Sequence, residues 1–268
     1  MGITNRLKRL VLGEPTPIEQ APQAIAEAIQ APPQRRPTIP NGPKLNLGCG
    51  FDIRPGWVNI DMHDWHKPDL VADVTDLHAL PDNHAGFALA QDILEHIHRA
   101  RCSTALREWN RVLMMGGILE VRSPDVVALA NLMQHDPTRQ TPEAQAVLLQ
   151  CMFGTQTYNG DFHYNGFTEI SIRHSFAEAG FEVVALDHQD EWNMLVVGRK
   201  IAHTPPEPML RLPSDEEFLK EAYRVALGRE ADEEGLAHFL ARLAEGAPRE
   251  TVLETLRHAR KANPEGHV

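Results

Sequence analysis

Short apolar runs alternate with longer segments of helical periodicity between residues 44 and 200. This alternation is typical of a mainly parallel sheet with flanking helices, because parallel strands need long connections that are usually helical. Seven runs have strand character, at residues 44–48, 57–62, 69–72, 86–91, 117–122, 181–187 and 193–199. Four segments have helical periodicity, at residues 100–114, 125–135, 142–152 and 167–179. The pattern predicts an α/β domain over residues 44–203, with a Rossmann-like seven-stranded, mostly parallel sheet.

A separate extension is predicted before this domain, over residues 1–43. From Glu14 to Pro43 the chain is rich in Pro, Gln and Ala, which indicates a tether. Before the tether, residues 3–12 place apolar side chains on one helical face, with basic side chains mostly beside or opposite it. This segment is either a short helix that packs on the protein or frays, or a weak contact with a membrane surface.

A second proline-rich break, at residues 204–212, predicts a linker. Beyond it, three amphipathic patterns over residues 213–268 predict a small all-α three-helix bundle. Ser214 and Glu217 form a capping box at the start of the first helix. The bundle resembles an uncharacterised helical module that recurs in bacterial glycan-related and surface proteins, so we expect it to bind a protein partner.

Composition and charge narrow the class of protein. The 268 residues are 42% hydrophobic and 24% charged, as in soluble globular proteins. A net charge of −11 repels phosphate, so we expect no nucleic-acid partner. The three cysteines lack metal-ligand or disulfide spacing, and no apolar run could span a bilayer or serve as a signal peptide. We expect a cytoplasmic protein, peripheral at the inner face of the membrane if residues 3–12 bind there.

A glycine pair follows the first predicted strand. Leu45–Leu47 leads directly into Gly48 and Gly50, where the absence of a Cβ lets the backbone approach a ligand. The second predicted strand ends in Asp61, whose carboxylate can accept hydrogen bonds from both ribose hydroxyls of a nucleoside. A dehydrogenase is disfavoured, because Ile53 stands where the dinucleotide fingerprint has its third glycine.

The connection between these two strands is short for a parallel crossover, which normally needs about a dozen residues or more. We expect a turn through residues 54–56 in place of a helix. The nucleoside interpretation requires that the two strands be neighbours in the sheet.

Five motifs in order carry a family resemblance: LNLGCG, GWVNID, ADVTDLHALP, DILEHI and EWNRVLMMGGILEVRSPD. Together they resemble the small class I S-adenosylmethionine-dependent methyltransferases often found among bacterial sugar and surface-polysaccharide genes. The similarity covers about residues 44–200. It implies a methyltransferase with S-adenosylmethionine as cofactor.

The resemblance also implies which residues contact the cofactor. Gly48 and Gly50 would pass under its methionine part, and Asp61 would bind its ribose. Asp73 and the backbone of Val74 match the family position at the adenine ring.

Further implied contacts lie at the middle of the cofactor. Gln91 and Asp92 end the fourth predicted strand and face this part. The family often has a smaller polar residue where Gln91 stands. The expected cofactor set is completed by Asn46, Cys49 and Met62. We interpret Cys49 as a small residue of the cleft floor and not as a nucleophile, because no histidine is placed beside it by a motif.

Three residues are candidates for the chemical step. His163 lies in the loop where the family builds its acceptor pocket, and its near-neutral pKa would suit a general base. Asp125, after the fifth predicted strand, is the alternative base or acceptor-binding group. His96, in the Leu-Glu-His run, would order the cofactor pocket. His96 and His98 diverge at helical spacing, so we expect no metal shared by this pair and no metal cofactor.

The expected reaction is O-methylation of a sugar or surface-polysaccharide intermediate. Methylation of a protein or a small metabolite is an alternative, since acceptor pockets vary independently of the cofactor half. A non-catalytic scaffold that retains the nucleoside fold is another alternative. Nucleobase amino groups are disfavoured as acceptors, because residues 90–93 read Ala-Gln-Asp-Ile and lack the Asn/Asp-Pro-Pro-aromatic motif of base-methylating enzymes.

Overall fold

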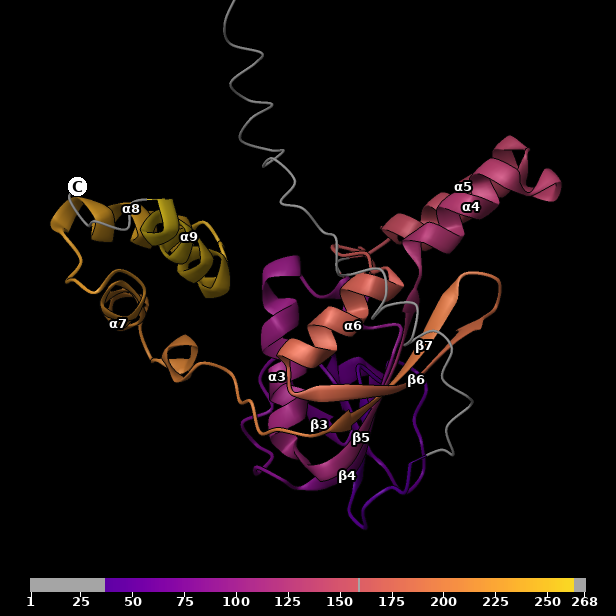
Figure 1. Ribbon diagram of the computed structural model, residues 1–268, viewed down its shortest axis with the longest axis horizontal. Coiled ribbons are helices and arrows are strands. Elements are labelled where there is room, and N and C mark those ends of the chain that lie inside the picture. Colours follow the sequence, from indigo (N-terminus) through magenta and orange to yellow (C-terminus); the bar gives the residue numbers. More distant parts are fainter. Residues whose placement is uncertain (1–36, 159, 263–268) are drawn as a thin grey trace, which may run out of the picture. The chain divides into compact units, whose positions relative to one another are not determined.

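Figure 1 shows the computed structural model of the protein, which describes residues 37–158 and 160–262. The helix predicted at residues 3–12, with its expected membrane contact, lies outside the described residues. The last part of the predicted tether lies within them. There the carbonyl of Pro43 accepts a hydrogen bond from the amide of Gly86 (3.0 Å), so the end of the tether packs against the domain.

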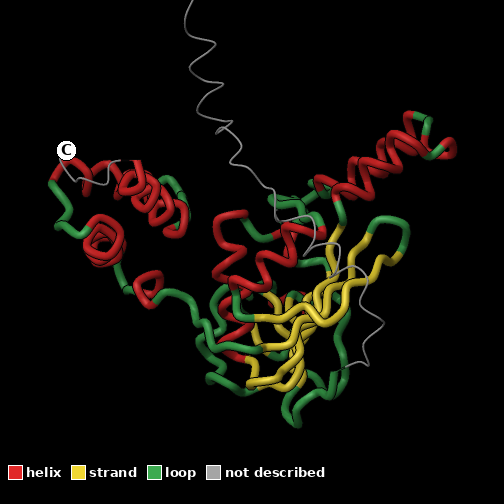
Figure 2. The backbone as a smooth tube through the Cα atoms, in the orientation of Figure 1, coloured by secondary structure: helices red, strands yellow, loops and turns green. Residues whose placement is uncertain are grey.

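The described residues contain a seven-stranded sheet, as predicted (yellow in Figure 2). Its strands are β1 (Lys44–Leu47), β2 (Val58–Asp61), β3 (Leu70–Val71), β4 (Ala85–Gln91), β5 (Leu113–Pro124), β6 (Phe181–Gln189) and β7 (Asn193–Lys200). In space their order is β3-β2-β1-β4-β5-β7-β6. Strand β7 runs antiparallel to both of its neighbours, and all other pairs are parallel. The predicted Rossmann-like, mostly parallel sheet is confirmed.

The four helices predicted within the domain are present, and the first and last of them pack on the sheet, whereas the middle two pack on each other and extend away from it (Figure 1). The four are α3 (Cys102–Val112), α4 (Val126–His135), α5 (Pro142–Phe153) and α6 (Glu169–Glu178). Helix α3 packs on β5, α6 packs on β6, and these two helices contact each other (Figure 1). The helix predicted at residues 100–114 ends at Val112. The chain then enters β5 through an irregular stretch, in which Gly116 adopts a φ of +75°.

The strand order reverses beside β1. The chain passes from β1 to β2 and β3 on one side, and then crosses to β4 on the other side of β1. In open α/β sheets, ligands bind at such a switch point, outside the carboxyl ends of the strands. The residues that follow Leu47 and Gln91 therefore border the position where the fold favours a ligand.

The first two strands are parallel neighbours despite their short connection. Leu45 lies opposite Val58 in the register, and only residues 48–57 join the two strands. The connection contains no helix. It closes with a turn in which the amide of Trp57 donates to the carbonyl of Arg54 (3.2 Å). Both the predicted pairing and the predicted turn are confirmed.

A buried polar network holds the segment after β3 against α3. The carboxylate of Glu108 is fully buried, and it accepts a hydrogen bond from the amide of Leu77 (2.7 Å) and pairs with Arg111 (2.8 Å). The indole of Trp109 donates to the carbonyl of Val74 (2.9 Å). A buried charge without a partner is strongly destabilising, so this network fixes the position of the segment.

The three predicted C-terminal helices are α7 (Asp215–Leu227), α8 (Glu233–Ala244) and α9 (Arg249–Ala262). They enclose a hydrophobic core separate from that of the sheet domain. Ser214 caps α7 by accepting a hydrogen bond from the amide of Glu217 (3.2 Å). The predicted capping box is incomplete, because the Glu217 carboxylate accepts from the Ser214 hydroxyl and not from its backbone amide. Met209, in the short turn η5 (Pro208–Arg211), is buried in this core, so part of the predicted linker packs with the bundle. None of the described helices is long and apolar enough to cross a membrane.

Candidate functional site

The loop after β1 turns at two glycines in the left-handed region. Their φ angles are +64° at Gly48 and +49° at Gly50, which glycine adopts without the strain other residues incur. A Cβ on Gly48 would lie 2.6 Å from the side chain of Ile93, so this glycine lets the loop pack against the end of β4. A Cβ on Gly50 would meet nothing within 4 Å. Gly50 therefore borders open space at the switch point.

Asp61, at the end of β2, organises this loop. Its Oδ2 accepts a hydrogen bond from the amide of Gly50 (2.9 Å). Its Oδ1 accepts one from the amide of His63 (2.8 Å) and lies 2.9 Å from Nδ1 of His66. Burial acts to raise the pKa of Asp61, but these hydrogen bonds outweigh burial and hold the pKa below its usual range. Asp61 is thus ionised at neutral pH, and Oδ2, which accepts one hydrogen bond from the protein, has capacity to accept another.

Asn46 has a structural position in the buried strand β1. Its amide donates to the carbonyl of Asp52 (2.6 Å) and to Oδ1 of Asn59 (3.1 Å). The side chain of Asn59 in turn donates to Asp69 (2.8 Å). This network shapes the glycine loop, and sequence reasoning missed Asn59 and Asp69. The one available signal was a polar residue inside the apolar strand β2.

Cys49 is buried between the two glycines, as expected of a cleft-floor residue. Burial, with the nearby charge of Asp61, raises the pKa of the Cys49 thiol to about 11. The thiol is therefore protonated at neutral pH and is a poor nucleophile.

Asp73 and Val74 lie in the segment after β3. Oδ2 of Asp73 pairs with Arg101 (3.0 Å), and its Oδ1 accepts a hydrogen bond from the amide of Thr75 (2.9 Å). Burial acts to raise the pKa of Asp73, but these partners outweigh it and lower the pKa. Arg101 and the amide of Thr75 therefore hold the Asp73 carboxylate in a fixed position.

Gln91 and Asp92 lie at the end of β4, next to the glycine loop. Oε1 of Gln91 accepts a hydrogen bond from Arg54 of that loop (3.3 Å). Asp92 has a φ of +52°, uncommon for a residue with a side chain, and it pairs with Arg122 of β5. The ends of β1, β4 and β5 are thus tied together by side chains.

Met62 opens a group of exposed apolar and aromatic side chains beside Asp61. Its side chain is 62% exposed, and Phe51 is 79% exposed. The Phe51 ring lies edge-on to Trp65 at 5.5 Å and to His66 at 4.7 Å. An apolar surface next to an ionised carboxylate suits a ligand with both a flat ring and hydroxyl groups.

Two separate parts of the chain match known family models. Residues 45–121 match the family described as a methyltransferase domain. Residues 210–261 match a domain of unknown function, DUF4214, over the C-terminal bundle. No curated protein matches the chain.

Several solved structures are similar in fold. One is the 1,6-didemethyltoxoflavin-N1-methyltransferase of Burkholderia thailandensis, which is 15% identical, with 60% of this chain and 72% of that chain covered and a TM-score of 0.42. Another is an S-adenosylmethionine-dependent methyltransferase of Methanosarcina mazei, which is 14% identical, with 59% and 92% covered and a TM-score of 0.44. A possible exported protein of Bordetella parapertussis is 18% identical, with 74% and 79% covered and a TM-score of 0.45.

Two of the three predicted catalytic residues, His96 and His163, meet beside the short turn that follows β4. The rings of His96 and His163 are 4.6 Å apart and nearly perpendicular. Burial lowers the pKa of both histidines, although the charge of Asp92 acts in the opposite direction on each. Both rings are therefore neutral at pH 7. Both also lie close enough to Asp92, at the end of β4, to feel its charge.

Asp125 has different partners. Its Oδ1 caps α4 by accepting a hydrogen bond from the amide of Val127 (2.8 Å), and its Oδ2 lies 3.1 Å from Nε2 of His188. The side chain is buried. Asp125 therefore has a structural role whether or not it contacts an acceptor.

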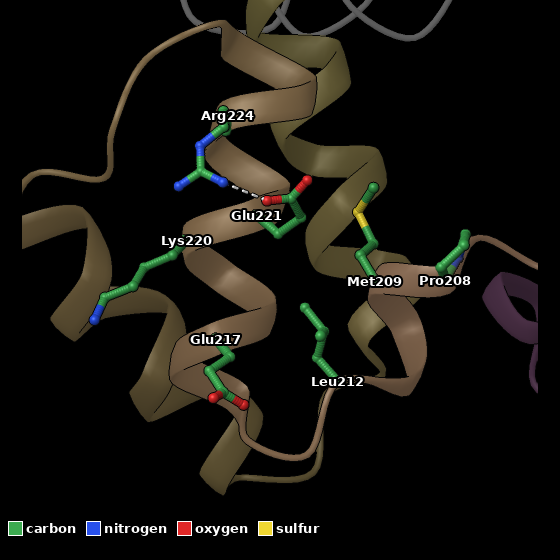
Figure 3. A pocket seen from close by; sticks show the side chains of 7 residues that line it. All are labelled: Pro208, Met209, Leu212, Glu217, Lys220, Glu221 and Arg224. Carbon is green, nitrogen blue, oxygen red and sulfur yellow. Dashed lines mark hydrogen bonds and ion pairs between the residues drawn. The ribbon is translucent and has the colours of Figure 1, made fainter.

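A surface hollow on the bundle lies outside the sheet domain (Figure 3). It has a volume of about 450 Å³ and is lined by Pro208, Met209, Leu212, Glu217, Lys220, Glu221 and Arg224. Glu221 and Arg224 pair with each other (2.6 Å), and the other charged lining groups are exposed. Paired and solvated charges give this hollow no evident chemical task.

Proposed function

We propose that the protein is an S-adenosylmethionine-dependent methyltransferase that O-methylates a sugar-type hydroxyl. The observation that carries the cofactor assignment is the pairing of Asp61 with the Gly50 amide at the switch point. This hydrogen bond places an ionised carboxylate oxygen and the open side of the glycine loop together at the carboxyl edge of the sheet. This edge follows directly on β1 and β2, within the stretch that matches the methyltransferase family.

The residues at this edge fit S-adenosylmethionine. Oδ2 of Asp61 has capacity to accept a hydrogen bond from a ribose hydroxyl besides the one from the Gly50 amide. The exposed side chains of Met62 and Phe51 offer apolar surface for the adenine ring. When bound, the cofactor supplies an electrophilic methyl group. The protein must then align the acceptor, exclude water and remove a proton.

His163 supports a hydroxyl acceptor. A sugar hydroxyl holds its proton tightly at pH 7, so a neutral imidazole within hydrogen-bond reach assists the transfer. In the structure His163 is half-buried, is neutral for the reason given above and lies beside His96. The sugar class itself rests on the resemblance of residues 44–200 to methyltransferases of bacterial polysaccharide gene groups.

The experiment has two stages. Calorimetry of the full chain with S-adenosylmethionine and S-adenosylhomocysteine measures cofactor binding, for which we expect one site. Methyl-labelled cofactor is then offered with nucleotide-activated sugars, oligosaccharides, small metabolites and a protein mixture, and we expect label in a carbohydrate. A folded chain that binds neither cofactor would favour the scaffold interpretation, and label confined to a metabolite or a protein would refute the sugar acceptor.

A further inference from the structure

Glu95, His96 and His163 form a cluster of metal-ligand type. One ligand atom from each side chain lies within 4.8 Å of the others. Glu95 and His96 belong to the short 3-10 turn η2 (Leu94–His96), and His163 belongs to the loop before α6. We infer that these three side chains bind one divalent transition-metal ion.

The carboxyl group of Glu95 is buried and incompletely hydrogen-bonded. The residue is only 2% exposed, and its Oε2 has no hydrogen-bond partner among the described residues. A buried polar atom without a partner costs free energy. The nearby Ser123 hydroxyl acts to lower the pKa of Glu95. Its geometry nevertheless does not meet that of a hydrogen bond, and the hydroxyl is itself buried without a partner among the described residues, so Oε2 stays unsatisfied. A cation between Glu95 and the two imidazoles would satisfy it.

His96 is already oriented as a metal ligand. Its Nδ1 lies 3.2 Å from the carbonyl oxygen of Phe162. A carbonyl can only accept, so Nδ1 carries the proton and Nε2 of the neutral ring is unprotonated. Metal-binding histidines commonly donate their second ring N–H to a carbonyl in this way, which fixes the tautomer and the ring plane.

Backbone hydrogen bonds hold the two parts of the cluster together. The amides of Tyr164 (2.9 Å) and Asn165 (3.2 Å) both donate to the carbonyl of Glu95. The amide of His163 donates to the carbonyl of Phe153 (3.1 Å). Ligands of one tetrahedral ion, at bond lengths near 2.0–2.2 Å, lie roughly 3.4 Å apart. The three ligand atoms, all within 4.8 Å of one another, would reach that separation by rotation of their side chains.

The donor set indicates the class of ion. Two imidazole nitrogens and one carboxylate suit Zn²⁺, Co²⁺ or Fe²⁺ better than Mg²⁺ or Ca²⁺, which prefer oxygen ligands. Three protein ligands leave a position open for an oxygen ligand, as in catalytic metal sites. A hydroxyl bound there would lose its proton more easily. This role in activating a hydroxyl rests on the proposed methyl transfer, and in it His163 would be a metal ligand and not the general base. Binding of the ion does not depend on the proposed methyl transfer.

The test is a titration of the full chain with Co²⁺ after removal of metals with a chelator, in the absence of cofactor and acceptor. We expect one equivalent to produce visible absorption bands of a four- or five-coordinate ion, and Zn²⁺ to displace it. His96→Ala and His163→Ala should each weaken binding at least tenfold. His98→Ala is the matched control, because His98 belongs to the same His-Ile-His run but is exposed and outside the cluster. It should bind as the wild type does.

Two results would overturn the site. One is a wild-type chain that shows no such bands at one equivalent. The other is an equal loss in His98→Ala and His163→Ala, which would indicate adventitious binding among the 14 histidines of the chain. If circular dichroism shows that a ligand variant is not folded, the presence or absence of Co²⁺ absorption bands in the wild-type chain decides whether the site exists. Because no methyl donor is present, failure of this site and failure of the methyltransferase proposal are separate outcomes.

Discussion

Nδ1 of His66 lies 2.9 Å from Oδ1 of Asp61, and both side chains are buried at the end of β2. This pair, together with the amides of Gly50 and His63, makes Asp61 a structural anchor of the glycine loop after β1 as well as the proposed binding group for the cofactor's ribose. Removal of the carboxylate should therefore affect both binding and stability.

Asp61→Ala should weaken S-adenosylmethionine binding about tenfold or more and lower the free energy of unfolding at pH 7 by roughly 1–3 kcal/mol. The pKa of Asp61 is depressed in the folded state, so its contribution is present above its unfolded pKa of about 3.9 and is lost as pH falls through the folded value. The stability gap between wild type and variant should thus be constant from about pH 5 to 7 and shrink below about pH 4. Calorimetry and urea unfolding measure these effects. Unchanged affinity in a folded variant would refute the ribose role.

Gly50→Ala should weaken cofactor binding at least tenfold, because its added methyl group would enter the space proposed for the ligand. Gly56→Ala is the matched control. Both glycines have positive φ, +49° and +77°, and an added Cβ meets nothing within 4 Å at either. Each substitution should cost about 1–2 kcal/mol of stability through backbone strain. Equal cofactor affinity in the two variants would place the ligand elsewhere.

His163→Ala should reduce the methyl-transfer rate about a hundredfold to ten-thousandfold and leave cofactor affinity nearly unchanged. His98→Ala, at an exposed site, should keep the wild-type rate. Single-turnover kinetics with the acceptor found in the labelling screen measure both rates. A normal rate in His163→Ala with a lower melting temperature would show that the residue only supports its loop.

Asp125→Ala should lower stability by about 0.5–2 kcal/mol, because it removes the cap of α4. Asp125→Asn should retain most of that stability, since Asn caps a helix about as well as Asp. Both variants should transfer methyl groups at near the wild-type rate. A large rate loss in the stable Asp125→Asn variant would instead identify Asp125 as the base.

Truncation after Pro206 should leave cofactor binding intact, because the proposed site and the bundle have separate cores. The cut retains Thr204, whose amide donates to Asn110 (2.9 Å) and whose hydroxyl donates to Ala179 (2.6 Å). It removes the ion pair of Arg211 with Glu108 (2.5 Å), but Glu108 keeps Arg111. Calorimetry on the truncated chain checks this. A folded truncation without affinity would show that the bundle completes the site.

Local patterns of the sequence predicted every strand and helix of the sheet domain to within a few residues. The reason is that burial on one or both faces imposes periodicity on each element. The strand-end positions of Gly50, Asp61 and Gln91 followed from the same patterns, because carboxyl ends of parallel strands share one edge.

Tertiary structure alone decided which side chains meet at that edge. The His-Ile-His run drew attention to His96 with His98, whereas the structure pairs His96 with His163. The buried contact of Asp61 with His66 had no signature in the sequence either. Such contacts depend on how one loop docks on another through backbone hydrogen bonds. Those bonds involve groups that every residue carries, so residue identity does not reveal them in advance.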